Sequence, residues 1–258
     1  KPGDPPKPNL YVLAMGVSQY PDKLKLNFCA TDAEMLAQAF QDKSKGAFNT
    51  IETKVLTDKA ATRQGILAGM DWLKSKMTPQ DVGIVSFSGH GTRDAFGRFY
   101  LVPFDVNPDP NSDPSDWAVS GDTFKKRLED MPGRLVAVLD ACHSGSVAEK
   151  EGPPPPPDTL VRDLTAEDSG VIVMCASLGR EYATESKLCK AGFFTLGLVE
   201  GLAGHADVDG DGVVYIHELD MYATARVRQL SGGKQNPTLG RPPAVKPFVV
   251  AKVDKPSP

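Results

Sequence analysis

Three runs of apolar residues constrain the fold of this chain more than any other feature. Residues 82–87 read Val-Gly-Ile-Val-Ser-Phe, residues 135–139 read Leu-Val-Ala-Val-Leu, and residues 171–175 read Val-Ile-Val-Met-Cys. Strands that are apolar on both faces are typical of parallel sheets, because helices cover both sides of such a sheet. We therefore expect an α/β protein in which these runs are buried strands.

Helical patterns separate the strands along the chain. Residues 32–41 and 62–76 place apolar side chains three and four positions apart, which is the spacing of one helix face. Thr62 is a candidate N-cap of the second helix. Residues 10–14 and 51–56 are expected to be strands, and the alternation implies right-handed crossover connections.

A histidine and a cysteine follow two of the apolar runs. His90 lies in Ser-Gly-His-Gly, directly after the run at 82–87, and Cys142 lies in Asp-Ala-Cys-His-Ser-Gly, directly after the run at 135–139. The functional crevice of an open parallel sheet lies outside the carboxyl ends of its strands. A cysteine there can act as a nucleophile, and a histidine can move its proton to a leaving group.

The two glycines beside His90 favour a functional rather than a structural role for its imidazole ring. Gly89 and Gly91 permit tight backbone approach and positive φ, so we expect the imidazole to be exposed rather than packed. His143 follows Cys142 directly, and its side chain is expected to point away from the thiol. A buried, purely structural role remains the alternative for both His90 and Cys142.

The segment around Cys142 resembles a motif of the caspase superfamily. Asp140-Ala-Cys-His-Ser-Gly is similar to the Asp-x-Cys-His-Ser-Gly of metacaspases and bacterial caspase-like peptidases (orthocaspases), whose histidine lies about 50 residues upstream. The resemblance covers nearly the whole chain and includes residues 11–20, 29–32, 100–105 and 192–195. It implies a caspase-like three-layer sandwich with a mostly parallel sheet of about six strands.

The same resemblance implies a cysteine endopeptidase that cuts after Arg or Lys. Cys142 would be the nucleophile and His90 its partner, with the backbone N–H groups of Gly91 and Cys142 as the oxyanion hole. The chemistry would require no cofactor. Its partner would be a polypeptide substrate with a basic residue before the scissile bond.

The resemblance also assigns the pocket for that basic residue to Asp32, Ser88 and Asp140. Two carboxylates in one pocket suit a guanidinium, which can be bound by paired hydrogen bonds. Taken alone, Asp32 could equally be an acid in the first turn of a helix, where the helix dipole favours it.

Proline-rich segments divide the chain. Residues 1–8 are expected to be a linker and residues 253–258 a tail, on either side of one catalytic domain at 9–252. Within that domain a large half (9–148) and a small half (169–252) are joined by a linker at 149–168 that contains five consecutive prolines. This linker can be a plain surface loop, or a site of self-cleavage after Lys150 or Arg162.

An acidic segment in the second half matches a calcium-binding pattern. Asp207, Asp209, Asp211 and Glu218 fit D-x-D-x-D-G-x5-E at every named position and could bind Ca²⁺ as structural support. The alternative is a capped turn without metal.

The calcium-activation site of metacaspases is elsewhere, in acids after the histidine and after the nucleophile. This chain departs from that pattern, because Arg98 stands near one expected acid and only Asp122 and Glu149 are partial matches.

Composition narrows the remaining possibilities. The net charge of −4 disfavours nucleic acid as a partner, and no apolar run reaches the roughly 20 residues of a membrane span. The four cysteines form no Cys-x-x-Cys pair, and Cys29, Cys175 and Cys189 are expected to be small buried residues. The expected location is a reducing compartment, the cytoplasm. A chain that begins at Lys1 is expected to have flanking domains in a longer protein.

Two other functions remain open on the sequence. One is a non-catalytic, calcium-stabilised interaction module of a larger protein. The other is a cysteine hydrolase that cuts after Asp, which the lack of recognisable pocket arginines disfavours. Serine-hydrolase, nucleotide-binding and zinc-protease functions lack their defining motifs.

Overall fold

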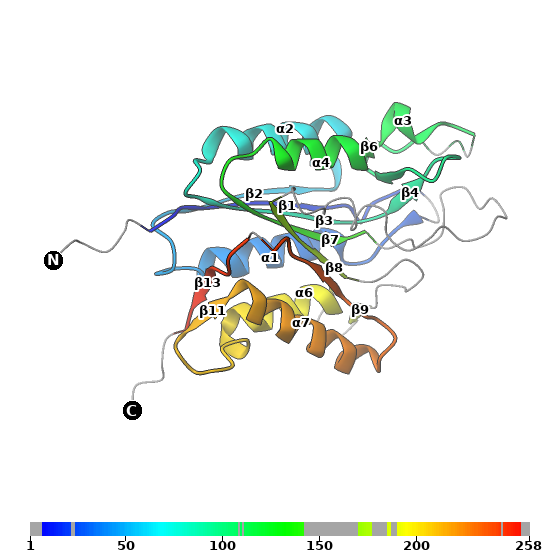
Figure 1. Cartoon of the computed structure of the whole chain (residues 1–258). Coiled ribbons are helices and arrows are strands. Elements are labelled where there is room, and N and C mark those ends of the chain that lie inside the picture. The colour runs from blue at the N-terminus through cyan, green and yellow to red at the C-terminus, as the bar shows by residue number, and fades with distance from the viewer. Residues whose placement is uncertain are drawn as a thin grey trace.

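A six-stranded sheet forms the centre of the protein, with strand order β12-β8-β7-β3-β1-β2 (Figure 1). The computed structural model describes residues 7–21, 24–107, 109, 111–141, 170–176, 185–186, 190–243 and 245–253. Five strands run parallel and β12 runs antiparallel to β8. The strands are β1 (Leu10–Gly16), β2 (Ile51–Thr57), β3 (Val82–Ser88), β7 (Arg134–Asp140), β8 (Val171–Cys175) and β12 (Thr238–Gly240).

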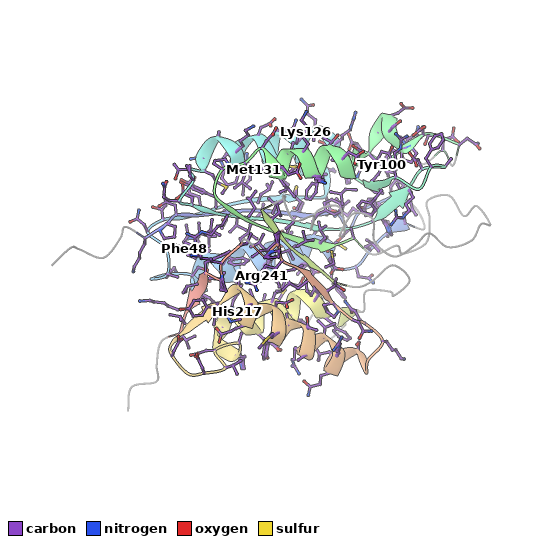
Figure 2. All side chains as sticks on the ribbon, viewed as in Figure 1. Phe48, Tyr100, Lys126, Met131, His217 and Arg241 are labelled. Atoms are coloured by element: carbon purple, nitrogen blue, oxygen red, sulfur yellow. The ribbon has the colours of Figure 1, made fainter. Side chains whose placement is uncertain are left out.

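Helices cover both faces of the sheet, which confirms the expected α/β sandwich. Helices α2 (Arg63–Lys76) and α4 (Gly121–Glu129) lie on one face, and α1 (Cys29–Lys43), α6 (Phe193–Glu200) and α7 (Ile216–Ser231) lie on the other (Figure 1). Met131, just after α4, and His217, on α7, mark these opposite sides in Figure 2. No helix in the part of the chain that the structure describes is long and apolar enough to cross a bilayer.

Side-chain alternation along the strands supplies both apolar layers. In β7, Leu135, Ala137 and Leu139 pack with α2 and α4, whereas Val136 and Val138 pack with α1, α6 and α7. Successive side chains of a strand point to opposite faces, so a strand covered on both sides must be apolar throughout. This requirement explains the apolar runs in the sequence.

The register of the parallel strands aligns their carboxyl ends. Gly16 of β1 pairs with Ser88 of β3, and Ser88 pairs with Asp140 of β7. Helix α1 starts directly against this edge. The approach is so close that a Cβ at Gly16 would collide with the Cys29 carbonyl. The motifs that contain His90 and Cys142 therefore begin at one edge of the sheet.

Smaller elements are arranged around the sheet. Strands β4 (Gly91–Arg93), β5 (Phe99–Leu101) and β6 (Val119–Ser120) form a three-stranded sheet, and β9 (Glu185–Ser186) pairs with β10 (Ala191–Gly192). Strand β11 (Val213–Tyr215) pairs with β13 (Val249–Lys252) on the side of the sheet that α1, α6 and α7 cover. The short helices are η2 (Asp58–Ala60) and α3 (Pro114–Trp117), and a π-helical turn, η3 (Gly201–His205), follows α6.

The sequence expectations for individual elements are largely confirmed. Thr62 caps α2 by accepting a 3.0 Å hydrogen bond from the Gly65 N–H. Helix α1 begins at Cys29 rather than at residue 32, and the Ser18 hydroxyl supports this earlier start by accepting the Ala30 N–H of the first turn. The expected linker at 149–168 lies outside the described residues.

Asp81 ties together the amino ends of the central strands. Its buried carboxylate accepts hydrogen bonds from the Asn9 N–H and from both the N–H and the hydroxyl of Thr78. Burial alone would raise the pKa of this carboxyl, but these hydrogen bonds outweigh burial and lower it. A lowered native pKa adds stability above the unfolded pKa of about 4, and this stability is lost as the pH falls through the native pKa.

We expect Asp81→Asn to destabilise the protein by about 1–3 kcal/mol at pH 7, because the amide NH₂ would face N–H donors in a buried place. Urea unfolding at pH 7 and at pH 3 measures this loss, which should shrink at the lower pH. Asp42→Asn, an exposed acid on α1, is the control and should change stability little. Equal losses for Asp81→Asn at both pH values would contradict the assigned role.

Candidate functional site

His90 is held at the carboxyl edge of β3 by backbone hydrogen bonds. The Gly89 N–H donates to the Asp140 carbonyl at 3.1 Å, and the His90 carbonyl accepts the Val102 N–H at 3.0 Å. The His90 N–H donates to the Tyr20 hydroxyl at 3.0 Å, and that hydroxyl donates to the Val102 carbonyl at 2.8 Å. The backbone of His90 is thereby fixed to three separate segments of the chain.

The glycines beside His90 provide space rather than unusual backbone angles. A Cβ at Gly89 would lie 2.6 Å from the Tyr20 hydroxyl, and one at Gly91 would lie 2.6 Å from the Phe99 ring. The close approach expected from the sequence is confirmed. The expected positive φ is wrong, since neither glycine has one.

The imidazole itself is buried, which corrects the expectation of an exposed ring. His90 is 4% exposed, because the Tyr20 ring packs against it with centroids 4.7 Å apart. Its Nε2 lies 2.7 Å from the Leu24 carbonyl oxygen. A carbonyl can only accept, so Nε2 carries the hydrogen and Nδ1 is the nitrogen that can exchange a proton.

Burial lowers the pKa of the His90 imidazole, and the hydrogen bond to the Leu24 carbonyl opposes this only in part. The neutral ring is therefore favoured at neutral pH. Because the native pKa lies below the unfolded value of about 6.5, the unfolded chain binds more protons between these two values. The contribution of His90 to stability thus falls as the pH drops below about 6.5.

The structure brings Asp32 and Asp140 together at Gly192. The two Oδ2 atoms lie 3.2 Å and 3.3 Å from the position that a Cβ of Gly192 would occupy, and the Gly192 N–H donates to Asp32 Oδ1 at 2.9 Å. Asp32 lies in the first turn of α1, Asp140 ends β7, and Gly192 precedes α6. Segments distant in sequence thus form one acidic site.

Ser88 lies on the same face of the sheet as Asp140. The two residues are paired in the register of β3 and β7, so their side chains point to the same side. Within the described residues the buried Ser88 hydroxyl has no hydrogen-bond partner. A buried hydroxyl without a partner costs about 1–3 kcal/mol, so this group is suited to bind a ligand.

Several residues singled out in the sequence lie outside the described residues: Cys142, His143, Glu149, Lys150, Arg162 and Cys189. The chain is described up to Ala141, whose carbonyl oxygen lies 3.2 Å from the Cβ position of Gly91. The residue before Cys142 is therefore beside the residue after His90. Cys29 and Cys175 are buried, as expected.

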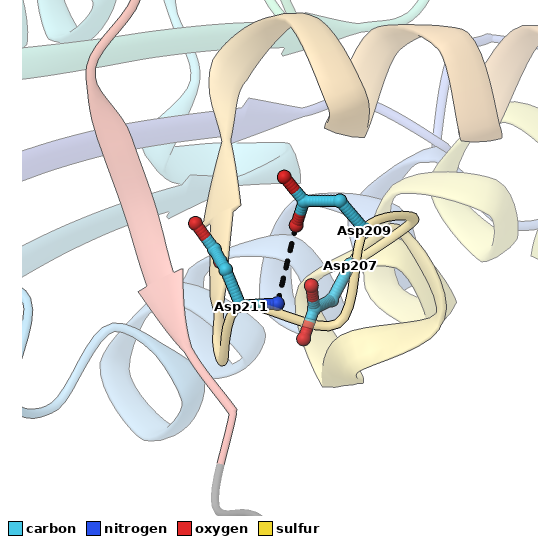
Figure 3. Close-up of side chains that lie close together, drawn as sticks. All are labelled: Asp207, Asp209 and Asp211. Atoms are coloured by element: carbon cyan, nitrogen blue, oxygen red, sulfur yellow. Dashed lines mark hydrogen bonds between the residues drawn. The ribbon is translucent and has the colours of Figure 1, made fainter.

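The acidic loop after η3 forms a compact group of three carboxylates (Figure 3). Asp207, Asp209 and Asp211 each offer an oxygen, and these oxygens lie within 4.8 Å of one another. The Asp209 carboxylate accepts the Asp211 N–H at 3.1 Å, and Asp207 Oδ2 accepts the Gly212 N–H at 3.1 Å. Asp207 Oδ1 is buried without a partner among the described residues.

Glu218, the fourth acid of the pattern, is not part of this group. It is buried, and its Oε2 accepts the Tyr215 N–H at 2.9 Å, which caps the start of α7. The structure thus joins three of the four expected ligands. The donor set consists of oxygens, which suits a hard cation such as Ca²⁺.

Three residues of the site were missed by sequence reasoning. Tyr20 and Leu24 hold His90, and Gly192 holds Asp32. Tyr20 and Gly192 were noted only as parts of family motifs, and no local pattern marks Leu24. Their roles depend on contacts across 66 to 160 positions of the chain.

Comparison with protein families and curated proteins gives one consistent result. A family model described as "Caspase domain" matches residues 10–249. Metacaspase-1A from Neurospora crassa is 30% identical over 152 residues, which cover 53% of this chain and 32% of that protein. Metacaspase-2 from Trypanosoma brucei brucei is 28% identical over 161 residues, which cover 56% of this chain and 44% of that protein. The matched region spans less than half the length of these two relatives.

Solved structures share the fold. Protein GSU0716 from Geobacter sulfurreducens is similar with a TM-score of 0.63 and 16% identity, covering 96% of this chain and 95% of that chain. The Drosophila initiator caspase Dronc is similar with a TM-score of 0.57 and 12% identity, covering 94% of this chain and 82% of that chain.

We expect Tyr20→Phe to raise the pKa of His90 toward its ordinary value and to cost about 1–3 kcal/mol of stability. The change leaves the His90 N–H and the Val102 carbonyl without their partner, which loosens the ring and lets water reach it. NMR titration of the imidazole and urea unfolding measure the two effects.

The control is Tyr100→Phe, which removes another buried hydroxyl, bonded to Asp94. It should lower stability and leave the titration of His90 unchanged. An unaltered His90 pKa in Tyr20→Phe would show that Tyr20 does not set the environment of the ring.

Proposed function

Because the chain belongs to the caspase-domain family of peptidases, we propose that it is a cysteine endopeptidase that hydrolyses peptide bonds after arginine or lysine. The observation that carries the proposal is the convergence of Asp32 and Asp140 on one point beside the edge that holds His90. Asp32 is buried and Asp140 is half-buried, and two carboxylates that face one point favour a group that is positively charged and donates hydrogen bonds. A basic side chain supplies both.

In the proposed mechanism the Cys142 thiolate attacks the carbonyl carbon of the scissile bond, and negative charge develops on the carbonyl oxygen. The N–H groups of Gly91 and Cys142 donate to that oxygen. When the C–N bond breaks, His90 gives its proton to the leaving amine. A water molecule, deprotonated by His90, then hydrolyses the thioester and releases the thiol.

The fixed orientation of His90 supports its part in this mechanism. Nε2 is engaged with the Leu24 carbonyl, which leaves Nδ1 to exchange the proton. The lowered pKa keeps the ring neutral at neutral pH, so it can accept the thiol proton. A neutral base beside a thiol is the usual means of activating a cysteine nucleophile.

The proposed pocket uses charge and hydrogen bonding together. The Asp32 and Asp140 oxygens would accept the N–H groups of a guanidinium or ammonium, and the unpartnered Ser88 hydroxyl would complete the set. Self-processing after Lys150 or Arg162 follows from the same specificity and is part of the proposal.

The proposal predicts cleavage of peptide reporters that end in Arg or Lys and no cleavage of those that end in Asp. Cys142→Ala should abolish cleavage and, if the linker is self-processed, leave the chain intact by mass. Asp32→Asn and Asp140→Asn should each lower kcat/KM for basic reporters by roughly 30- to 1,000-fold, since removing one partner of a buried charge pair costs about 2–4 kcal/mol.

Asp42→Asn is the matched control, because Asp42 is an exposed acid on the same helix as Asp32. Its kcat/KM should equal that of the wild type. Cleavage after Asp would overturn the proposed pocket but would still agree with Cys142 and His90 as the catalytic pair. No cleavage under any condition would favour the alternative of a non-catalytic interaction module.

We also propose that the loop at 207–218 binds Ca²⁺ and supports the small half of the domain rather than the chemistry. Three carboxylates within 4.8 Å repel one another, and the buried Asp207 Oδ1 has no partner among the described residues. A divalent cation would offset the repulsion and bind that oxygen. Glu218 binds the Tyr215 N–H through Oε2, so Oε1 is the oxygen with which it would join.

We expect millimolar Ca²⁺ to raise the melting temperature of the wild type, since a ligand that binds only the folded state stabilises it. Asp209→Ala should lose this response, because it removes the oxygen ligand entirely. Asp109→Ala, at an exposed acid in another loop, should keep it. Thermal unfolding with and without a chelator measures the effect, and a wild type that does not respond to Ca²⁺ would refute the proposal.

A further inference from the structure

Gly192 has an ordinary backbone conformation. It ends β10 and is the N-cap residue of α6, with φ −66° and ψ 146°. Any L-residue adopts these angles readily, so the backbone does not require glycine here. The reason for a glycine must therefore lie in the space around its Cα.

That space is bounded by two carboxylates. Within the described part of the chain, the atoms nearest to a Cβ at Gly192 are Asp32 Oδ2 at 3.2 Å, Asp140 Oδ2 at 3.3 Å and Asp32 Cγ at 3.8 Å. By contrast, a Cβ at Gly89 would meet the Tyr20 hydroxyl and the Phe87 ring, and one at Gly91 would meet the Phe99 ring and the Ala141 carbonyl. A methyl group on Gly192 would occupy the volume that both carboxylates face.

The Gly192 N–H also orients one of these carboxylates. It donates to Asp32 Oδ1 at 2.9 Å, in a buried place, so Oδ2 is the oxygen turned toward the shared volume. The N–H precedes the first turn of α6, where the helix dipole is positive. Both features favour the ionised form of neighbouring carboxylates.

We propose that Gly192 is a specificity-determining residue of the acidic pocket. Its bare backbone forms the wall against which the cationic end of a basic side chain lies, and its N–H positions Asp32. This inference rests on the proposed function and adds a residue to its pocket. It does not require that the bound group be cleaved.

Gly192→Ala tests the wall directly. We expect kcat/KM for Arg and Lys reporters to fall at least about tenfold, mainly through KM, because a single added methyl group in a tight site has effects of this size. The melting temperature should stay near that of the wild type, because the backbone angles suit alanine. Alkylation of Cys142 by iodoacetamide, which carries no basic group, should keep its rate.

A second measurement needs no variant. Butylguanidinium, titrated into the wild type, should shift the ¹⁵N–¹H resonance of Gly192, whereas the neutral isostere butylurea should not. Asp140→Asn should weaken the response to butylguanidinium at least about tenfold, since it removes one of the two charges. This readout holds even where Gly192→Ala does not fold.

The outcomes separate this inference from the proposed function. If the wild type cleaves basic reporters and Gly192→Ala cleaves them with the same kcat/KM, the role of Gly192 is overturned and the proposed peptidase activity stands. Binding of butylguanidinium at Gly192 without any cleavage would support the role of Gly192 in the acidic pocket and overturn the proposed peptidase activity. An unshifted Gly192 resonance at saturating butylguanidinium would overturn the inference outright.

Discussion

The parallel register of β1, β3 and β7 is the constraint on which the site depends. It aligns Gly16, Ser88 and Asp140 at one edge of the sheet. A slip by one residue would turn Ser88 and Asp140 to the opposite face, because side chains alternate along a strand. The same slip would misplace Val138, which is buried beneath α1 and α6. Core packing therefore fixes the position of the polar residues.

The acidic site depends on a contact between segments that lie 160 positions apart in the sequence. Asp32 comes from α1, and the N–H that binds it comes from Gly192, directly before α6. Two carboxylates that face one volume repel each other, and burial of Asp32 adds a desolvation cost. The N–H at the start of α6 offsets part of this cost. The site is therefore coupled to the packing of α6 on α1.

The sequence predicted the elements that local patterns encode. The apolar runs identified β3, β7 and β8, because a strand covered on both faces admits few polar residues. The family resemblance selected Asp32 and Asp140, and the structure brings them together. The contacts of Tyr20 and Leu24 with His90 escaped prediction, since these hydrogen bonds join segments about 70 positions apart and leave no local signal.

The glycines explain why the environment of His90 was predicted wrongly. In Gly210 and Gly212 of the acidic loop, a positive φ accounts for the residue type. At Gly89, Gly91 and Gly192 φ is not positive, and the residue type follows from what lies within 3.3 Å of the missing Cβ. The sequence shows the same letter in both cases. Only the tertiary structure distinguishes a glycine that bends the chain from one that makes room, and in this site the second kind surrounds both His90 and the acidic pocket.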